Sequence, residues 1–131
     1  MSFCYRFTIK GNPAIKKNNR MSVHNKRTGR SFPIKSKKLQ GAEANAYADL
    51  MEQKRRSMVL PIRTPVNVCF IFYRETRHKT DLSNLYELPQ DALQKAKILE
   101  DDYLIESHDG SRRRYDPENP RTEITITPFA E

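Results

Sequence analysis

The chain has 131 residues, a length that suits one domain (residues 1–131) and is enough to enclose one hydrophobic core. Its 24 Lys and Arg against 16 Asp and Glu give a net charge of +8, which favours a polyanion such as nucleic acid as partner. No apolar run approaches the roughly 20 residues of a membrane-spanning helix and nothing resembles an export signal, so we expect a cytoplasmic protein without membrane association. Cys4 and Cys69 lie far apart without a histidine cluster, which argues against a disulfide framework or a zinc site.

The amino-terminal third of the chain is basic. Residues 4–11, CYRFTIKG, alternate as a strand does and end at a glycine. Residues 1–42 contain eleven Lys and Arg, and the first acidic residue is Glu43. Residues 12–38 mix Gly, Pro and Asn with Lys and Arg and show no helical or strand period, so we expect a long basic loop there. This loop is either an arm that contacts phosphates or a solvated, partly disordered surface.

A helix and a central strand are expected next. Residues 36–58 contain no proline, and their apolar residues recur at helical spacing, which predicts a helix with one apolar stripe. That stripe consists of Leu39, Ala42, Ala46 and Leu50. Residues 65–75, PVNVCFIFYRE, are rich in Val, Phe and Ile, which predicts a central strand.

A second helix is predicted to begin just after Asp81, where Ser83 or Asn84 could accept the first free backbone N–H groups. Pro89 falls inside this helix, so we expect a kink or a restart there. Two more strands are expected over residues 103–107 and 121–127, joined by a basic turn. Together these elements predict an α/β (α+β) domain with a mixed sheet of about four strands and two main helices.

Six carboxylates fall between residues 81 and 102 of this otherwise basic chain. Asp81 stands at a strand-to-helix junction, and Asp101 and Asp102 stand at the next helix-to-strand junction. If the helix folds back antiparallel to its strands, we expect both junctions at the same end of the sheet. Glu87 and Asp91, four residues apart, share one face of a continuous helix. Such carboxylates are the hard oxygen ligands that Mg²⁺ or Mn²⁺ prefers, or they form a solubilising acidic face that offsets the basic arm.

Three short motifs follow one another across this acidic block. They are DLSNL at residues 81–85, DAL at residues 91–93 and LEDD at residues 99–102. Their order and spacing resemble the DLDN, DAL and DD motifs of the RusA family of Holliday junction resolvases. The early GNPAIKK, the AEANAYAD of the first helix and the terminal RTEITIT strand are also similar to that family, so the resemblance covers nearly the whole chain.

The resemblance implies a small RusA-like homodimeric endodeoxyribonuclease that needs Mg²⁺ or Mn²⁺ and no small-molecule cofactor. Its substrate would be branched DNA, the four-way junctions of recombination and repair, which it would resolve by paired symmetric nicks. By matching positions, Asp81 and Asp102 would be the primary metal ligands, and Asp91 would correspond to the Asp of the DAL motif. Asp91, Asp101 and Glu87 would be further ligands or catalytic acids just outside the ligand set, one of them orienting the attacking water. The basic residues expected to grip phosphates are Lys16, Lys17, Arg20, Lys79, Arg112, Arg113 and Arg114. Small resolvases of this kind are often derived from phages.

Two positions depart from the family pattern. Ser83 stands where the family usually has the second Asp of DLDN, and Glu87 stands where it commonly has a Lys. Either the carboxylate has moved from position 83 to position 87, about one helical turn away, or metal affinity has fallen. In the second case the protein would be a catalytically weakened or inactive binder of structured nucleic acid. A third alternative is a basic ribosome-associated protein that binds structured RNA.

Overall fold

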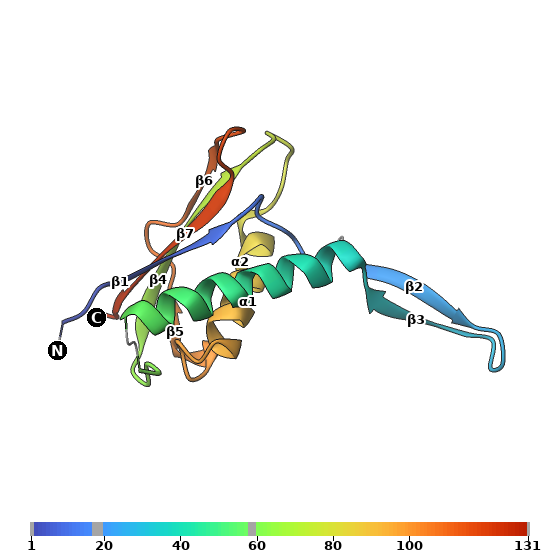
Figure 1. Ribbon diagram of the computed structural model, residues 1–131, viewed down its shortest axis with the longest axis horizontal. Coiled ribbons are helices and arrows are strands. Elements are labelled where there is room, and N and C mark those ends of the chain that lie inside the picture. The colour runs from blue at the N-terminus through green and yellow to red at the C-terminus, as the bar shows by residue number, and fades with distance from the viewer. Residues whose placement is uncertain (1, 17–19, 58–59, 131) are drawn as a thin grey trace.

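The computed structural model describes residues 2–16, 20–57 and 60–130, and it combines one mixed sheet, two long helices and a separate hairpin (Figure 1). The predicted α+β class is confirmed. The described residues form more strands than the four expected. The elements in chain order are β1 (Tyr5–Lys10), β2 (Arg20–Asn25), β3 (Arg30–Lys35), α1 (Lys37–Ser57), β4 (Val66–Arg74), α2 (Leu82–Lys95), a short 3₁₀ turn η1 (Asp102–Leu104), β5 (Ile105–Ser107), β6 (Arg112–Tyr115) and β7 (Arg121–Pro128).

The main sheet has the order β1-β7-β4, and the outer edge of β4 pairs with both β5 and β6. The β1–β7 and β7–β4 pairs are antiparallel, whereas β5 and β6 run parallel to β4. The central position predicted for residues 65–75 is therefore confirmed. Alternate residues of β4 point into the core, which explains its run of apolar residues: Val66, Val68, Phe70 and Phe72 are all buried.

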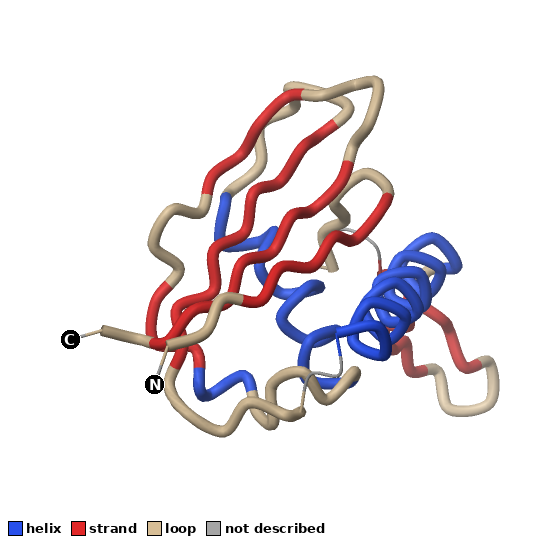
Figure 2. The backbone as a smooth tube through the Cα atoms, turned by 60° about the vertical axis from the view of Figure 1, so that its left-hand side comes forward, coloured by secondary structure: helices blue, strands red, loops and turns tan. Residues whose placement is uncertain are grey.

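Both helices pack on one face of the main sheet (Figure 2). The predicted stripe of α1 is confirmed at Leu39, Ala46 and Leu50, which are fully buried, and Ala42 packs at its margin. Helix α2 continues through Pro89 without a break, so the restart expected there is wrong. Pro89 is buried on the same side of α2 as Leu85 and Leu88, and this packing offsets the loss of one backbone hydrogen bond. In the part of the chain that the structure describes, no helix is long and apolar enough to cross a membrane.

The long loop expected over residues 12–38 is wrong, because β2 and β3 form an antiparallel hairpin within it. Their register pairs Asn25 with Arg30 around a turn at residues 26–29. Gly29 takes a positive φ of 72° in this turn, a conformation that glycine adopts without strain. Pro33, whose residue type disfavours a strand, is tolerated because β3 pairs on one side only among the strands that the structure describes.

The basic turn expected after residue 107 also contains a strand. Arg112–Tyr115 form β6, all of whose residues are exposed, and among the described strands it pairs with β4 alone. An edge strand with charged side chains needs no apolar alternation, so the sequence carried no strand period there. This strand brings three consecutive arginines beside the carboxyl end of β4.

Candidate functional site

Helix α2 connects two parallel strands and thereby decides where the acidic block lies. Val66 at the start of β4 pairs with Ile105 at the start of β5. The helix must therefore carry the chain from the end of β4 back to its beginning. Asp81 lies at the carboxyl end of β4, and Asp102 lies near the amino end of β4. The expectation that both junctions meet at one end of the sheet is wrong, because a parallel crossover returns the chain to the end where it started.

Asp81 and Asp102 lie at opposite ends of α2. Asp81 is the residue that precedes the helix, and the backbone N–H of Asp102 donates to the Oε1 of Gln94 in its last turn, at 3.1 Å. At about 1.5 Å of rise per residue, the 14 residues of α2 span about 21 Å. Oxygen ligands lie about 2.0–2.6 Å from Mg²⁺ or Ca²⁺, so these two carboxylates of one chain do not fit around a single ion. Among the described residues, no three His, Cys, Asp or Glu side chains gather as a metal site.

The residue before Asp81 is held by two arginine side chains. The Asp81 carboxylate is exposed and accepts no capping hydrogen bond from α2, so it stays available to another partner. The preceding residue, Thr80, receives two guanidinium groups. Arg74 donates to the Thr80 hydroxyl at 2.9 Å, and Arg113 donates to the Thr80 carbonyl oxygen at 2.8 Å. These hydrogen bonds fix the arginines next to the start of α2.

Four arginines, which we call the arginine cluster, line one shallow pocket together with Thr76 and Tyr115: Arg74, Arg77, Arg113 and Arg114. Arg77 stacks on the Tyr115 ring, with its guanidinium carbon 4.0 Å from the ring centroid. Burial lowers the pKa of Arg74, and the positive charge of Arg113 lowers it further. None of the four forms an ion pair with a carboxylate of the described residues. Crowded guanidinium groups without carboxylate partners are suited to bind phosphate.

Two adjacent carboxylates occupy the other end of α2. Asp101 is exposed and accepts the backbone N–H of Tyr103 at 2.9 Å. Burial raises the pKa of Asp102, and the neighbouring Asp101 raises it further through a hydrogen bond and its negative charge. A cation bound to this pair would relieve the repulsion. Tyr103, which follows the pair, is 82% exposed.

A third group of charges lies where the basic arm meets the helices. Lys16 is buried and forms ion pairs with Asp91 of α2 and, at 3.3 Å, with Glu43 of α1. Glu43 also pairs with Lys35, the last residue of β3, at 2.9 Å, and lies 3.9 Å from Lys95. Burial acts to raise the pKa of Glu43, but hydrogen bonds from Lys35 and Lys16 outweigh it and lower that pKa. We call Lys16, Lys35, Glu43 and Asp91 the arm anchor.

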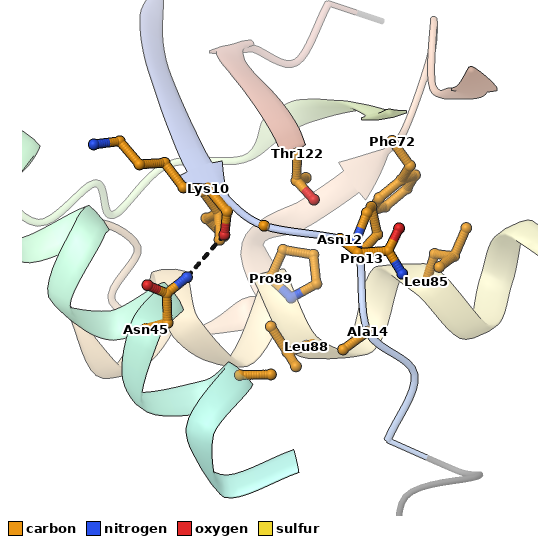
Figure 3. A pocket seen from close by; sticks show the side chains of 13 residues that line it. Lys10, Asn12, Pro13, Ala14, Asn45, Phe72, Leu85, Leu88, Pro89 and Thr122 are labelled. Atoms are coloured by element: carbon orange, nitrogen blue, oxygen red, sulfur yellow. Dashed lines mark hydrogen bonds between the residues drawn. The ribbon is translucent and has the colours of Figure 1, made fainter. Parts of the chain in front are cut away.

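A separate pocket lies between β1 and the two helices and holds no acidic side chain (Figure 3). Its lining is mainly apolar and includes Phe72, Leu85 and Pro89. Asn45 of α1 donates to the carbonyl oxygen of Lys10 at 2.8 Å on one side of this pocket. This contact attaches α1 to the end of β1 and contributes to packing.

The family described as endodeoxyribonuclease RusA matches residues 10–127. The chain belongs to the RusA family. This confirms the resemblance expected from the three motifs, and the family is one of Holliday junction resolvase-type nucleases. The matched region contains the arginine cluster, both ends of α2 and the arm anchor. No curated protein matches the chain.

The residues of the RusA motifs are thus divided among three places. Asp81 follows Thr80, which two arginines of the cluster contact, Asp101 and Asp102 lie at the far end of α2, and Asp91 belongs to the arm anchor. Glu87 and Ser83 are exposed on α2, one turn apart, and Glu87 forms no ion pair within the described residues.

The predicted phosphate-binding residues are likewise spread over the molecule. Arg113 and Arg114 belong to the arginine cluster, and Lys79 and Arg112 are exposed near it on the chain. Lys16 is buried in the arm anchor, with little surface left for a phosphate. Lys17 lies outside the described residues, and Arg20 is described only by its backbone in β2.

Sequence reasoning missed Arg74, Arg77 and Glu43. Arg74 is the last residue of β4 and Arg77 follows it in the next loop. Their positions do not indicate a phosphate site until β6 is known to pair with β4. Glu43 carried a weak signal, because it is the first acidic residue after a long basic segment.

Proposed function

We propose that this RusA-family protein is a Mg²⁺- or Mn²⁺-dependent endodeoxyribonuclease that resolves four-way DNA junctions by paired symmetric nicks. The observation that supports it best is the arginine cluster next to the exposed Asp81. Guanidinium groups without carboxylate partners can hold a phosphodiester, and an exposed carboxylate beside that phosphate can hold a divalent cation. A bound divalent ion would neutralise charge on the phosphate and activate water. We expect the protein to act in the cytoplasm of a bacterial or phage-infected cell.

We infer that each metal site forms across two subunits of a homodimer. The separation of about 21 Å along the 14 residues of α2 keeps Asp81 away from Asp102 in one chain. A two-fold axis that pairs α2 with its copy in antiparallel orientation would bring Asp81 of one subunit to Asp101 and Asp102 of the partner subunit. The cation would then offset the burial and the repulsion from Asp101, which together raise the pKa of Asp102. A C2 dimer with two such sites also suits the approximate two-fold symmetry of a four-way junction.

The first experiment compares a labelled four-way junction with a linear duplex of matched sequence, in Mg²⁺, Mn²⁺ or EDTA. We expect paired nicks in the junction alone, only with metal, and none with Asp81→Asn or Asp102→Asn. Binding of the junction should survive in both variants, because each removes a negative charge near phosphates. Cleavage that continues in EDTA would refute the metal requirement.

Mixed dimers test whether the site spans two subunits. Chains with Asp81→Asn and differently tagged chains with Asp102→Asn are refolded together, and the heterodimer is isolated by both tags. In a site shared between subunits, one of the two sites keeps both aspartates, so single nicks should return. If each site lies within one chain, both sites carry a substitution and no nick should appear.

The second candidate is a RusA-like protein that binds structured nucleic acid without cutting it. Ser83 and Glu87 favour it, since a hydroxyl replaces one family carboxylate and an acidic side chain replaces the usual lysine. This candidate predicts tight, salt-dependent binding of the junction that does not respond to Asp81→Asn or Asp102→Asn, and no cleavage in any metal. Ser83→Asp with Glu87→Lys would restore cleavage if these two positions alone had removed it.

A further inference from the structure

The β2–β3 hairpin stands apart from the rest of the molecule. Its strands pair only with each other among the described strands, and Figure 1 shows it projecting beyond the start of α1. Residues 24–31, which include the turn, are all exposed. Each strand has six residues, so at about 3.3 Å per residue the hairpin extends about 20 Å. The exposed residues 24–31 add nothing to the core and are free to contact a partner.

Three cations gather at the end of this ribbon: Lys26, Arg27 and Arg30. None of them forms an ion pair with a carboxylate in the described ranges. The turn that carries them is ordered by two hydrogen bonds to Asn25, whose Oδ1 accepts the Arg27 N–H at 2.9 Å and whose carbonyl oxygen accepts the Gly29 N–H at 2.8 Å. The end of the hairpin is therefore a structured cationic tip.

The arm anchor fixes the direction of the hairpin. Lys35 at the end of β3 and Lys16, just before the hairpin, both pair with Glu43 of α1. Lys16 also pairs with Asp91 of α2. Ion pairs at its base thus tie the hairpin to the two helices that carry the acidic residues.

We propose that the β2–β3 hairpin is a DNA-reading ribbon that enters the major groove of one duplex arm of the branched substrate, away from the cleaved bonds. This inference rests on the proposed function. The major groove of B-DNA is about 12 Å wide and admits a two-stranded β-ribbon. The cations of the tip match the phosphates that border the groove, and the anchored base holds the ribbon at a set angle to α2. DNA contacts at the hairpin would therefore orient an arm relative to the acidic residues.

The charge contribution is tested by Lys26→Gln with Arg27→Gln and Arg30→Gln, in EDTA, where no cleavage interferes. Three lost phosphate contacts should reduce the slope of log K against log salt by about 2.7, at about 0.9 per contact. The matched control is Arg55→Gln with Arg56→Gln and Arg63→Gln. It removes the same charge from side chains that pair with Glu52 and Glu100, remote from the hairpin in the sequence. Equal slopes for the two triple variants would overturn the proposal.

The groove itself is tested with junctions whose arms carry glucosylated 5-hydroxymethylcytosine, which fills the major groove and leaves the phosphates unchanged. Wild-type affinity should fall to the level of the hairpin variant, while that variant should bind modified and plain junctions equally. An unchanged wild-type affinity would overturn the groove assignment. Because both measurements are made without metal, they give the same answer whether or not the protein cuts DNA.

Discussion

Lys16 belongs to a basic segment suited to DNA, yet its side chain is only 9% exposed and faces two acids. Its partners, Glu43 and Asp91, lie on two different helices. Asp91 matches the aspartate of the DAL motif, and its pairing with Lys16 gives that aspartate a structural contact of its own. We therefore expect Lys16 and Asp91 to act on the position of the arm more than on the phosphate.

Replacing Lys16 by Met should lower the free energy of unfolding by about 1–3 kcal/mol, because two partly buried carboxylates lose a hydrogen-bonding cation. The loss stays below that of a fully buried pair, since Glu43 keeps Lys35 and the Asp91 side chain is 41% exposed. Urea denaturation measures it. Lys37→Met, at an exposed lysine of α1, is the control and should change stability by less than about 0.5 kcal/mol. Equal changes in the free energy of unfolding for the two substitutions would contradict a stabilising role of the arm anchor.

Within the arginine cluster, Arg113 makes the shorter of the two hydrogen bonds to Thr80, the residue before Asp81. Arg113→Gln should reduce the salt slope of junction binding by about one, since one phosphate contact is lost. It should also slow cleavage, because its hydrogen bond to the Thr80 carbonyl oxygen fixes the start of α2. Filter binding over a range of salt concentrations gives the slope. Arg63→Gln replaces an arginine that is already paired with Glu100, so it should leave the salt slope unchanged.

At the scale of single elements, the β4–α2–β5 crossover decides the arrangement of the acids. A helix that joins two parallel strands runs opposite to them, so its two ends lie at opposite ends of the sheet. Strand β6 then adds arginines next to the carboxyl end of β4, at the start of α2. One end of α2 thereby combines a carboxylate with cations, and the other end holds two adjacent carboxylates.

Asp102 offers a pH test of the second end of α2. Its pKa is raised by burial and by Asp101, so the folded state prefers the protonated form, and this contribution to stability grows as pH falls through the folded-state pKa. Asp102→Asn should therefore stabilise the metal-free protein at neutral pH, by no more than about 0.5 kcal/mol. The advantage should disappear in acid below the ordinary Asp pKa of 3.8. Thermal unfolding at both pH values measures it, and a variant that is less stable at neutral pH would contradict the prediction.

At the scale of the whole molecule, the two surfaces that we propose to bind DNA lie outside the hydrophobic core. The core lies between the main sheet and the two helices, the arginine cluster lies outside it, and the hairpin projects away from the main sheet (Figure 1). A duplex arm held by the hairpin and a phosphate held by the arginine cluster would engage separate parts of one subunit. In the metal sites that we propose, a second subunit supplies the carboxylate that α2 keeps distant within one chain.

Dilution tests this dependence on a dimer. The cleavage rate per chain should be constant at high protein concentration and fall as the dimer dissociates, because a lone chain cannot bring Asp81 to Asp102. Sedimentation over the same concentrations should show twice the mass of the chain wherever the rate is constant. A rate per chain that stays unchanged in samples that sediment as monomers would contradict a shared site.

Periodicity in the sequence predicted the strand at 4–11, the helix at 36–58 and the central strand at 65–75, and three short motifs predicted the family. Local periodicity identifies such elements, because burial of one face imposes it. Periodicity did not predict the hairpin or β6, because strands outside the core need no apolar alternation. Three relations emerged from the folded arrangement alone: Lys16 pairs with Asp91, Arg74 lies with Arg113, and α2 separates Asp81 from Asp102. These relations depend on the direction and pairing of elements distant in sequence, which spacing along the chain does not specify.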